Sequence, residues 1–141
     1  MLGQSASWSL HPQLARAGVA LGDLPLSRVL VMNDANYPWL VLVPRRPDLV
    51  EIIDLGEADR IALMAEVSAV AAGLKRATRC DKLNIAALGN VVAQLHVHVI
   101  ARFRNDPAGP RAVWGQVPAR PYPAAELERL MLALRAELAL G

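Results

Sequence analysis

The sequence predicts an α+β fold in which an antiparallel sheet carries helices on one face, with the elements in the order β-β-α-β-β-α. Three observations lead to this prediction. Two short apolar runs, 28–32 and 39–43, flank a segment rich in turn-forming residues. Apolar residues recur at steps of three and four over 57–78. Side chains alternate with period two over 94–103, as in a strand of a sheet.

The N-terminal part is expected to contain one short helix and then a hairpin. Pro12 is a suitable first residue for a helix through Ala20, which Gly22 and Asp23 would end. The runs Arg28–Met32 and Trp39–Val43 are predicted to pair as antiparallel strands around the intervening turn.

The middle of the chain is predicted to form the central helix, from about Glu57 to Thr78. Asp54 is a plausible cap before it. Its apolar stripe consists of Ile61, Met64, Val67, Ala71 and Leu74. A third strand is expected over Lys82–Leu88, ahead of the turn Gly89-Asn90.

Beyond the alternating strand, the segment from Asn105 to Pro121 holds several prolines and glycines and is predicted to be a long irregular loop, of a kind that is often functional. Pro123 would open a last helix. Its apolar stripe, which we expect to pack in the core or in a dimer interface, consists of Leu127, Leu130, Met131, Leu134 and Leu138.

Composition limits the classes of function. The 141 residues suit one domain, with a core over about 26–104, a loop over 105–121 and a C-terminal helix over 123–140. A net charge of +2 with few aromatic residues does not favour nucleic-acid binding. Cys80 is the sole cysteine, which suits a reducing compartment. No apolar run is long enough to span a membrane and no signal peptide is evident, so we expect a soluble cytoplasmic protein.

The alternating strand carries the strongest functional signal. Two of the three histidines, His96 and His98, share one face of it with Gln94 and Arg102. The opposite face is expected to enter the core through Leu95, Val97, Val99, Ala101 and Phe103. A neutral imidazole is a good nucleophile near pH 7, and a second imidazole can donate a hydrogen bond to an anion. This row therefore suits covalent catalysis on a phosphate, to which the Gly89-Asn90 turn could also contribute hydrogen-bond donors.

The string Gln94-Leu95-His96-Val97-His98-Val99 resembles the motif of the histidine triad (HIT) superfamily, in which His-φ-His-φ-His-φ-φ (φ apolar) ends a nucleotide-binding domain. Gln94 stands at the usual first histidine, and the string is similar to a bacterial branch with glutamine there. Asn84, Gly89 and Asn90 fall near the family's Asn…Gly-Gln elements. The resemblance implies a HIT-like antiparallel sheet of about five strands.

The resemblance also implies roles for individual residues. His96 would attack the α-phosphate and carry the nucleotidyl group, His98 would bind non-bridging oxygens, and Gln94 would orient the site. Asn33 or Asp34 would meet the ribose, while Asn84 and Asn90 would line the phosphate side near Gly89. Trp114 is expected at a base or at a partner chain. No metal or other cofactor is implied, the ligand would be a purine nucleotide, and family members are commonly homodimers.

Several alternatives stay open from the sequence. Arg102 either belongs to the site or pairs with an acid. Val91, an apolar residue where a related branch carries a donor, and the substituted first position also suit a non-catalytic nucleotide-binding or signalling module. A third interpretation makes His96 and His98 a zinc or iron site, but His11 is the sole further histidine, and no carboxylate is nearby in sequence.

Overall fold

The computed structural model describes residues 7–140. Its centre is an antiparallel sheet of five strands in the order β1-β2-β3-β5-β4. The strands are β1 (Gly18–Asp23), β2 (Ser27–Met32), β3 (Trp39–Pro44), β4 (Lys82–Ala86) and β5 (Val97–Arg102). The helices are α1 (Pro12–Ala17), the short 3-10 helix η1 (Ile52–Asp54), α2 (Glu57–Thr78) and α3 (Ala124–Glu137). The expected α+β fold with an antiparallel sheet is confirmed.

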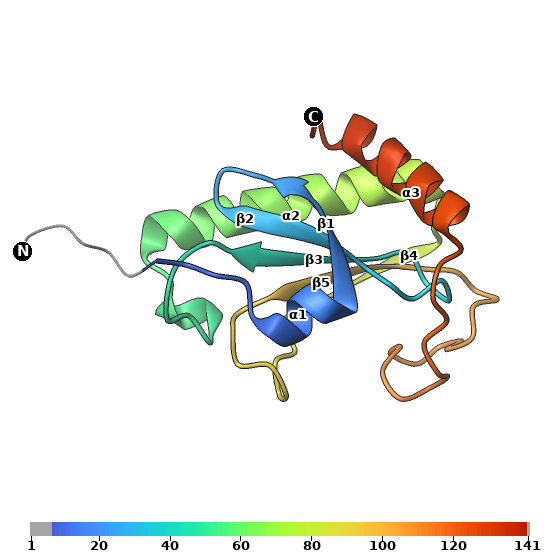
Figure 1. The fold of residues 1–141 in the computed structure, drawn as a ribbon, viewed down its shortest axis with the longest axis horizontal. Helices are drawn as coiled ribbons and strands as arrows, with labels where there is room; N and C mark the ends of the chain where they lie inside the picture. The colour runs from blue at the N-terminus through green and yellow to red at the C-terminus, as the bar shows by residue number, and fades with distance from the viewer. Residues whose placement is uncertain (1–6, 141) are drawn as a thin grey trace, which may run out of the picture.

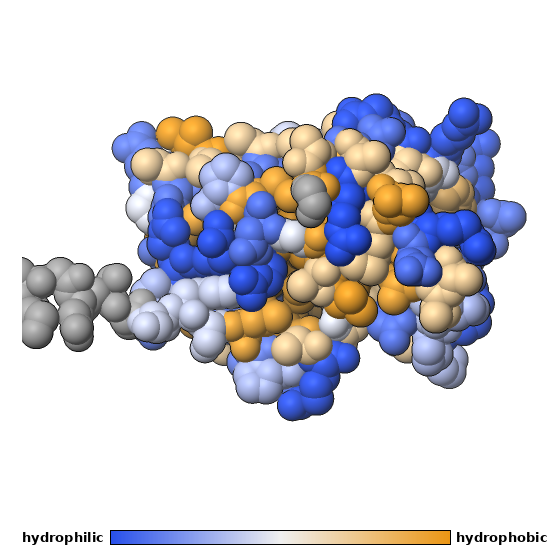
Figure 2. Space-filling model, turned by 45° about the horizontal axis from the view of Figure 1, so that its top comes forward, coloured by the Kyte–Doolittle hydropathy of each residue, from blue (hydrophilic) through white to orange (hydrophobic). Residues whose placement is uncertain are grey.

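The sheet has two differently covered faces. Figure 1 shows α2 and α3 on one side of it, with α1 and the loop that follows β5 on the other. The helical side holds the main core, to which the sheet contributes Val29, Val31, Leu40, Leu42, Val97, Val99 and Ala101. On this side of the molecule, apolar residues reach the surface between polar ones (Figure 2). The opposite side holds two smaller clusters, one under α1 and one under the loop.

A buried carboxylate fixes α2 against the sheet. Glu66 is only 8% exposed, and its two oxygens accept hydrogen bonds from the backbone N–H groups of Leu26 at 2.7 Å and Ser27 at 3.0 Å. Hydrogen bonds of this kind are the condition for burying a charged group. Glu66 therefore fixes the position of α2 at the start of β2.

The N-terminal region differs from the prediction. The first helix ends at Ala17, and the residues that were expected to continue and end it form β1, which pairs with β2. Leu21 is the sole buried side chain of β1, so the strand lacks the regular alternation by which a half-buried strand is recognised. With β1, which precedes the predicted hairpin, the sheet has five strands.

The bounds of α2 agree with the prediction, but two details of the helix do not. Asp54 does not cap it: its side chain accepts from the backbone of Val50 and Glu51 and closes η1, while Gly56 occupies the N-cap. Ile61 and Met64 were expected in the core and are 66% and 67% exposed. Leu63, which lies between them in the sequence, is buried instead, so the face of α2 that packs on the sheet runs through Leu63, Glu66 and Val70 and leaves Met64 at its side.

The remaining elements lie close to the expected positions. The hairpin β2–β3 is antiparallel, β4 ends two residues earlier than predicted, and β5 starts at Val97 rather than at Gln94. In α3, Met131 and Leu134 are buried and Leu127, Leu130 and Leu138 pack against the main core, as predicted. Among residues 7–140, no helix is long and apolar enough to cross a membrane.

Candidate functional site

The two histidines line a cavity of about 370 Å³ on the side of the sheet that α1 covers. The cavity walls come from α1, from β3 and from the segment between β4 and β5. Besides His96 and His98, the lining includes Gln13, Ala17, Trp39, Gly89, Asn90, Val91 and Trp114. The structure thus brings both histidines and the Gly89-Asn90 turn to one cavity.

Hydrogen bonding fixes which nitrogen of His96 carries its proton. Nδ1 lies 2.7 Å from the backbone carbonyl oxygen of Gln94, and a carbonyl can only accept. Nδ1 must therefore be the protonated nitrogen when the ring is neutral. The lone pair is then left on Nε2, which is the form that a nucleophilic histidine needs.

His98 is held as the opposite tautomer. The indole Nε1–H of Trp39 donates to its Nδ1 at 3.0 Å, so its proton is on Nε2, which lies 3.3 Å from the carbonyl oxygen of Leu88. Burial, and after it the positive charge that neighbouring His96 carries when protonated, together lower the pKa of His98 to about 4, against a smaller opposite effect of the Leu88 carbonyl. His98 is therefore a neutral N–H donor at physiological pH.

The side chain of Gln94 makes no hydrogen bond with His96 or His98 and binds the N-terminal segment instead. Its Oε1 accepts from the backbone N–H of His11 at 2.8 Å, and its Nε2 donates to the carbonyl oxygen of Ser9 at 2.9 Å. The group that contacts His96 is the backbone carbonyl of Gln94. The expected orienting role thus falls to the main chain, while the carboxamide binds the N-terminal segment.

Gly89 allows the turn beside the histidines to close tightly. A Cβ atom at this position would lie 2.9 Å from the carbonyl oxygen of Val92 and 3.7 Å from Cε1 of His96. Asn90 is exposed on the cavity wall, and Val91, 84% exposed, presents an apolar group there. The close approach explains why a residue without a side chain occupies position 89.

A second cavity, of about 400 Å³, adjoins the first and shares Ala17, Met32, Trp39 and Trp114 with it. Asn33 and Asp34, one of which was predicted to contact the ribose, both line it. Both side chains also hold the chain after β5. Asn33 Oδ1 accepts from the N–H of Tyr122 at 2.9 Å, and Asp34 Oδ1 accepts from that of Arg120 at 3.2 Å.

Arg102 and Asn84 lie apart from the histidine cavity. Arg102 is 6% exposed, and its five N–H groups all have partners. These are both carboxylate oxygens of Asp106, Oδ1 of Asn84, and the carbonyl oxygens of Gly109 and Arg111. The alternative in which Arg102 pairs with an acid is therefore the one observed, and Asn84 is one of its partners.

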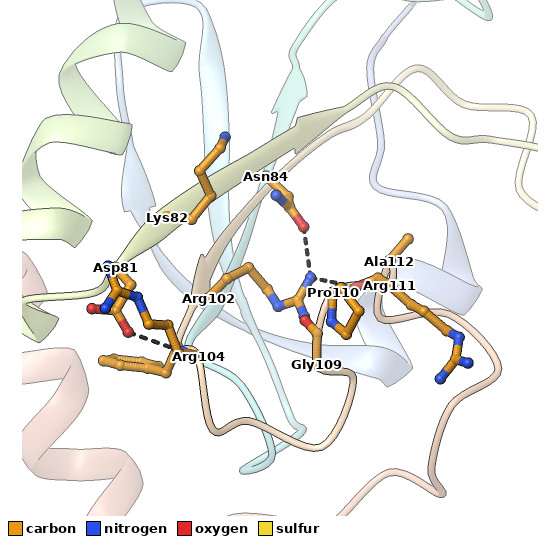
Figure 3. A pocket seen from close by; sticks show the side chains of 10 residues that line it. Asp81, Lys82, Asn84, Arg102, Arg104, Gly109, Pro110, Arg111 and Ala112 are labelled. Carbon is orange, nitrogen blue, oxygen red and sulfur yellow. Dashed lines mark hydrogen bonds between the residues drawn. The ribbon is translucent and has the colours of Figure 1, made fainter.

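The pocket around this cluster has a volume of about 400 Å³, and the charged side chains on its rim do not converge on one point (Figure 3). Lys82, Arg104 and Arg111 point in different directions from its rim. Burial would raise the pKa of Asp106, but the hydrogen bonds from Arg102 and from the backbone outweigh it, and the pKa is lowered. The cluster is a charged pair that stabilises the loop.

Trp114 lies on that loop and packs against the site. Its ring is edge-on to His98, with centroids 5.1 Å apart, and edge-on to Trp39 at 5.6 Å. The loop is held at one end by Arg102 and at the other by the Asn33–Asn36 turn. These anchors place the indole between the two cavities.

The sequence did not predict that Trp39 and one face of α1 line the histidine cavity. Trp39 pairs with Ile100 across β3 and β5, which makes it the diagonal neighbour of His98 on the same face. The strand register, had it been known, was the signal for this contact. Gln13 and Ala17 carried no comparable signal, because the segment before β1 is weakly patterned.

A metal site built on the histidine pair finds no support in the geometry. Within the part of the chain that the structure describes, no three His, Cys, Asp or Glu side chains are grouped as metal ligands. Nδ1 of His98 already accepts from Trp39. A usual site needs a third or fourth ligand.

Comparisons with known proteins agree with this architecture. The HIT domain family model matches residues 16–105. A histidine triad protein from Bradyrhizobium japonicum is 56% identical, with a TM-score of 0.93 over 94% of this chain and 99% of that one. Histidine triad proteins from Sinorhizobium meliloti (45% identity, TM-score 0.91, 93% and 97% covered) and Marinobacter aquaeolei (40%, 0.92, 95% and 98%) are also similar. The comparison with curated proteins gave no match.

Proposed function

The chain belongs to the histidine triad (HIT) family, and from that premise we propose that it is a nucleotide hydrolase or nucleotidyl transferase. Membership supports a function within this superfamily of nucleotide-binding proteins and hydrolases. The proposed substrates are nucleoside polyphosphates, dinucleoside polyphosphates or nucleoside phosphoramidates, attacked at the α-phosphate.

The tautomer of His96 is the observation that carries this proposal. With Nδ1–H donating to the Gln94 carbonyl, the Nε2 lone pair can attack the α-phosphorus. A P–N bond then forms, and the bond from phosphorus to the leaving oxygen or nitrogen breaks, with the leaving group taking up a proton. Water or another acceptor next attacks phosphorus, the P–N bond breaks, and His96 is regenerated.

His98 would stabilise the charge on the transferred group. Its Nε2–H makes only a long contact of 3.3 Å with the Leu88 carbonyl and would be available to a non-bridging oxygen. Because burial lowers the pKa of His98 to about 4, it would do so as a neutral donor. Asn90 on the cavity wall offers a carboxamide for the same phosphate.

The test is release of AMP from a panel of dinucleoside polyphosphates and adenosine phosphoramidates, followed by chromatography. The wild type should release AMP, and His96→Ala should lower the rate by about a thousandfold or more while still binding AMP. Equal rates for the two proteins would contradict the covalent mechanism. If both proteins bound nucleotide and neither formed product, the result would favour the non-catalytic module. The apolar Val91 on the cavity wall and the hydrogen bond between the Gln94 side chain and His11 are the features consistent with that module.

We further propose that the protein is a homodimer that pairs through β4. This strand is at the edge of the sheet, so among the described residues one row of its backbone N–H and C=O groups pairs with no other strand. Beside it, Met64, Ile85 and Ile52 are 67%, 51% and 41% exposed and line one shallow apolar hollow. A second copy would cover both the edge and the apolar side chains.

A pair of matched variants tests the dimer. Ile85→Lys on β4 should convert the protein from a dimer to a monomer of 15.2 kDa in light scattering coupled to size exclusion. Leu132→Lys, at a 71% exposed position on α3, should leave the mass unchanged. A wild type that is monomeric at micromolar concentration would refute the proposal.

A further inference from the structure

The side chain of Gln94 joins two segments that are far apart in the sequence. Its Oε1 accepts from the N–H of His11 and its Nε2 donates to the carbonyl of Ser9, so one carboxamide makes both of its main-chain hydrogen bonds within three residues. These residues immediately precede α1, and the side chain of His11 caps that helix by accepting from the N–H of Gln13. We call this contact the Gln94 clasp.

The clasp sets the position of a wall of the site. Leu14 of α1 is 4% exposed and packs with Leu30, Val41 and Val43 on the sheet. On the same helix Gln13 and Ala17 line the histidine cavity, and Arg16 lines the adjoining one. A six-residue helix is too short to be stable alone, so its position depends on such contacts.

Among the described residues that line the two cavities, Arg16 is the one arginine or lysine. It is exposed, and no ion pair involves it among the described residues. Asp34, on the same cavity, is already hydrogen-bonded to backbone N–H groups. A ligand with an anionic group would find a permanently charged partner on α1.

We propose that α1 is a substrate-recognition element, held over the histidines by the Gln94 clasp, and that Arg16 on it contacts the phosphate of a bound nucleotide. Gln94 is then a positioning residue for α1, not for the nucleophile. The inference rests on the proposed nucleotide ligand but not on turnover. It assigns glutamine at the first position of the triad a task that a histidine there would not perform with the same two bonds.

This assignment separates binding from chemistry. The bond from Nδ1 of His96 goes to the backbone carbonyl of Gln94, and that carbonyl survives any substitution at position 94. Loss of the carboxamide should therefore loosen α1 and weaken binding, while the rate of the bound substrate stays close to that of the wild type. If instead the side chain orients His96, the rate should fall and binding should not.

The experiment compares Gln94→Ala, Gln94→His and the near-isosteric Gln94→Glu, which cannot donate to the Ser9 carbonyl, with Leu132→Ala at an exposed position on α3 as control. Hydrogen exchange over residues 8–17 and tryptic cleavage after Arg16 report on α1. Calorimetry with AMP reports on binding, and KM and kcat are measured wherever AMP release is detectable.

In each of the three Gln94 variants, exchange over 8–17 and cleavage at Arg16 should rise, AMP should bind about three- to tenfold more weakly, and kcat should change less than KM. Unchanged exchange over 8–17 in Gln94→Ala would overturn the proposal. So would a fall in kcat at constant KM that Gln94→His restores. Absence of turnover in every protein would count against the proposed enzymatic function, while exchange and AMP binding would still decide the role of the clasp.

The contact of Arg16 is tested with a ligand pair. Arg16→Gln should weaken the binding of AMP about three- to tenfold and leave that of adenosine unchanged, because adenosine lacks the phosphate. Arg129→Gln, at an exposed position on α3, serves as the control for the change in net charge. Equal loss for AMP and adenosine, or no loss for AMP, would contradict the contact.

Discussion

The two ends of β5 present polar residues on the same face of the sheet, yet they differ in what their hydrogen-bonding groups are free to do. At the far end, every N–H of Arg102 is paired inside the protein. At the near end, His96 keeps a lone pair on Nε2, and His98 has one long contact at Nε2. One residue, Ile100, separates the saturated end from the open one along this face.

The difference follows from charge. A guanidinium that is 6% exposed must find partners for its donors, and the loop after β5 supplies them. An imidazole can be buried without a counter-charge by remaining neutral, as the pKa of about 4 for His98 indicates. The histidine end can therefore leave hydrogen-bonding capacity for a substrate, whereas the arginine end has none left.

The largest expected effect on stability is at the saturated end. Arg102→Met should lower the free energy of unfolding by about 3–5 kcal/mol, because it leaves the carboxylate of Asp106, whose side chain is 4% exposed, buried without its partner. Urea unfolding measures the change. His96→Ala, at the open end, should cost about 2 kcal/mol or less, since it removes one side-chain hydrogen bond and a partly packed ring.

The double variant Arg102→Met with Asp106→Asn sharpens this test. Removing both charges should recover part of the lost stability, because the unpaired carboxylate is then absent. If Arg102→Met instead left the unfolding curve unchanged and raised KM, the guanidinium would be a substrate contact, and the contrast between the two ends would fail.

An intermediate effect is expected from the pH dependence of the open end. The pKa of His98 is about 4 in the folded protein against 6.5 as its ordinary value, so below about pH 6.5 the unfolded chain binds a proton that the folded one refuses. Stability contributed by the neutral ring is thus complete above pH 6.5 and is lost as the pH falls towards 4. Between pH 7.5 and pH 5, the wild type should lose about 1–2 kcal/mol more than His98→Asn in urea unfolding. Parallel changes of unfolding free energy with pH in the two proteins would contradict this prediction.

The smallest effect on stability is expected at Trp39. Trp39→Phe keeps an aromatic ring but removes the donor to Nδ1 of His98, at a cost of about 1 kcal/mol. Nitrogen chemical shifts of the His98 ring should then report a mixture of tautomers instead of Nε2–H alone. Shifts that match the wild type would mean that another group fixes the tautomer.

The sequence predicted the chemistry of the open end better than that of the saturated one. Period-two alternation was enough to bring His96 and His98 to one face, because it depends on the chain alone. The same alternation put Arg102 in the row, but its acceptors include the carbonyls of Gly109 and Arg111, whose positions depend on the path of an irregular loop. No pattern in the residues encodes that path.

Elements were predictable where burial repeats regularly. The bounds of α2 agreed because its ends coincide with a change of pattern, whereas β1 was missed because a single side chain, Leu21, is buried in it. Ile61 and Met64 fit a helical stripe, yet lie exposed on the N-terminal half of α2. The face that packs on the sheet runs through Leu63, Glu66 and Val70, and an apolar pattern cannot identify a face that includes a glutamate.

Anchoring at both ends gives the loop after β5 an evolutionary consequence. Its first part is fixed by Arg102 and its last part by Asn33 and Asp34, so changes between 115 and 117 need not disturb either attachment or the buried side chain of Val113. Doubling the length of a flexible segment between fixed ends costs only about 0.6 kcal/mol in closure entropy. Insertions after Trp114 should thus cost the scaffold little, and we expect relatives to vary in length at this point.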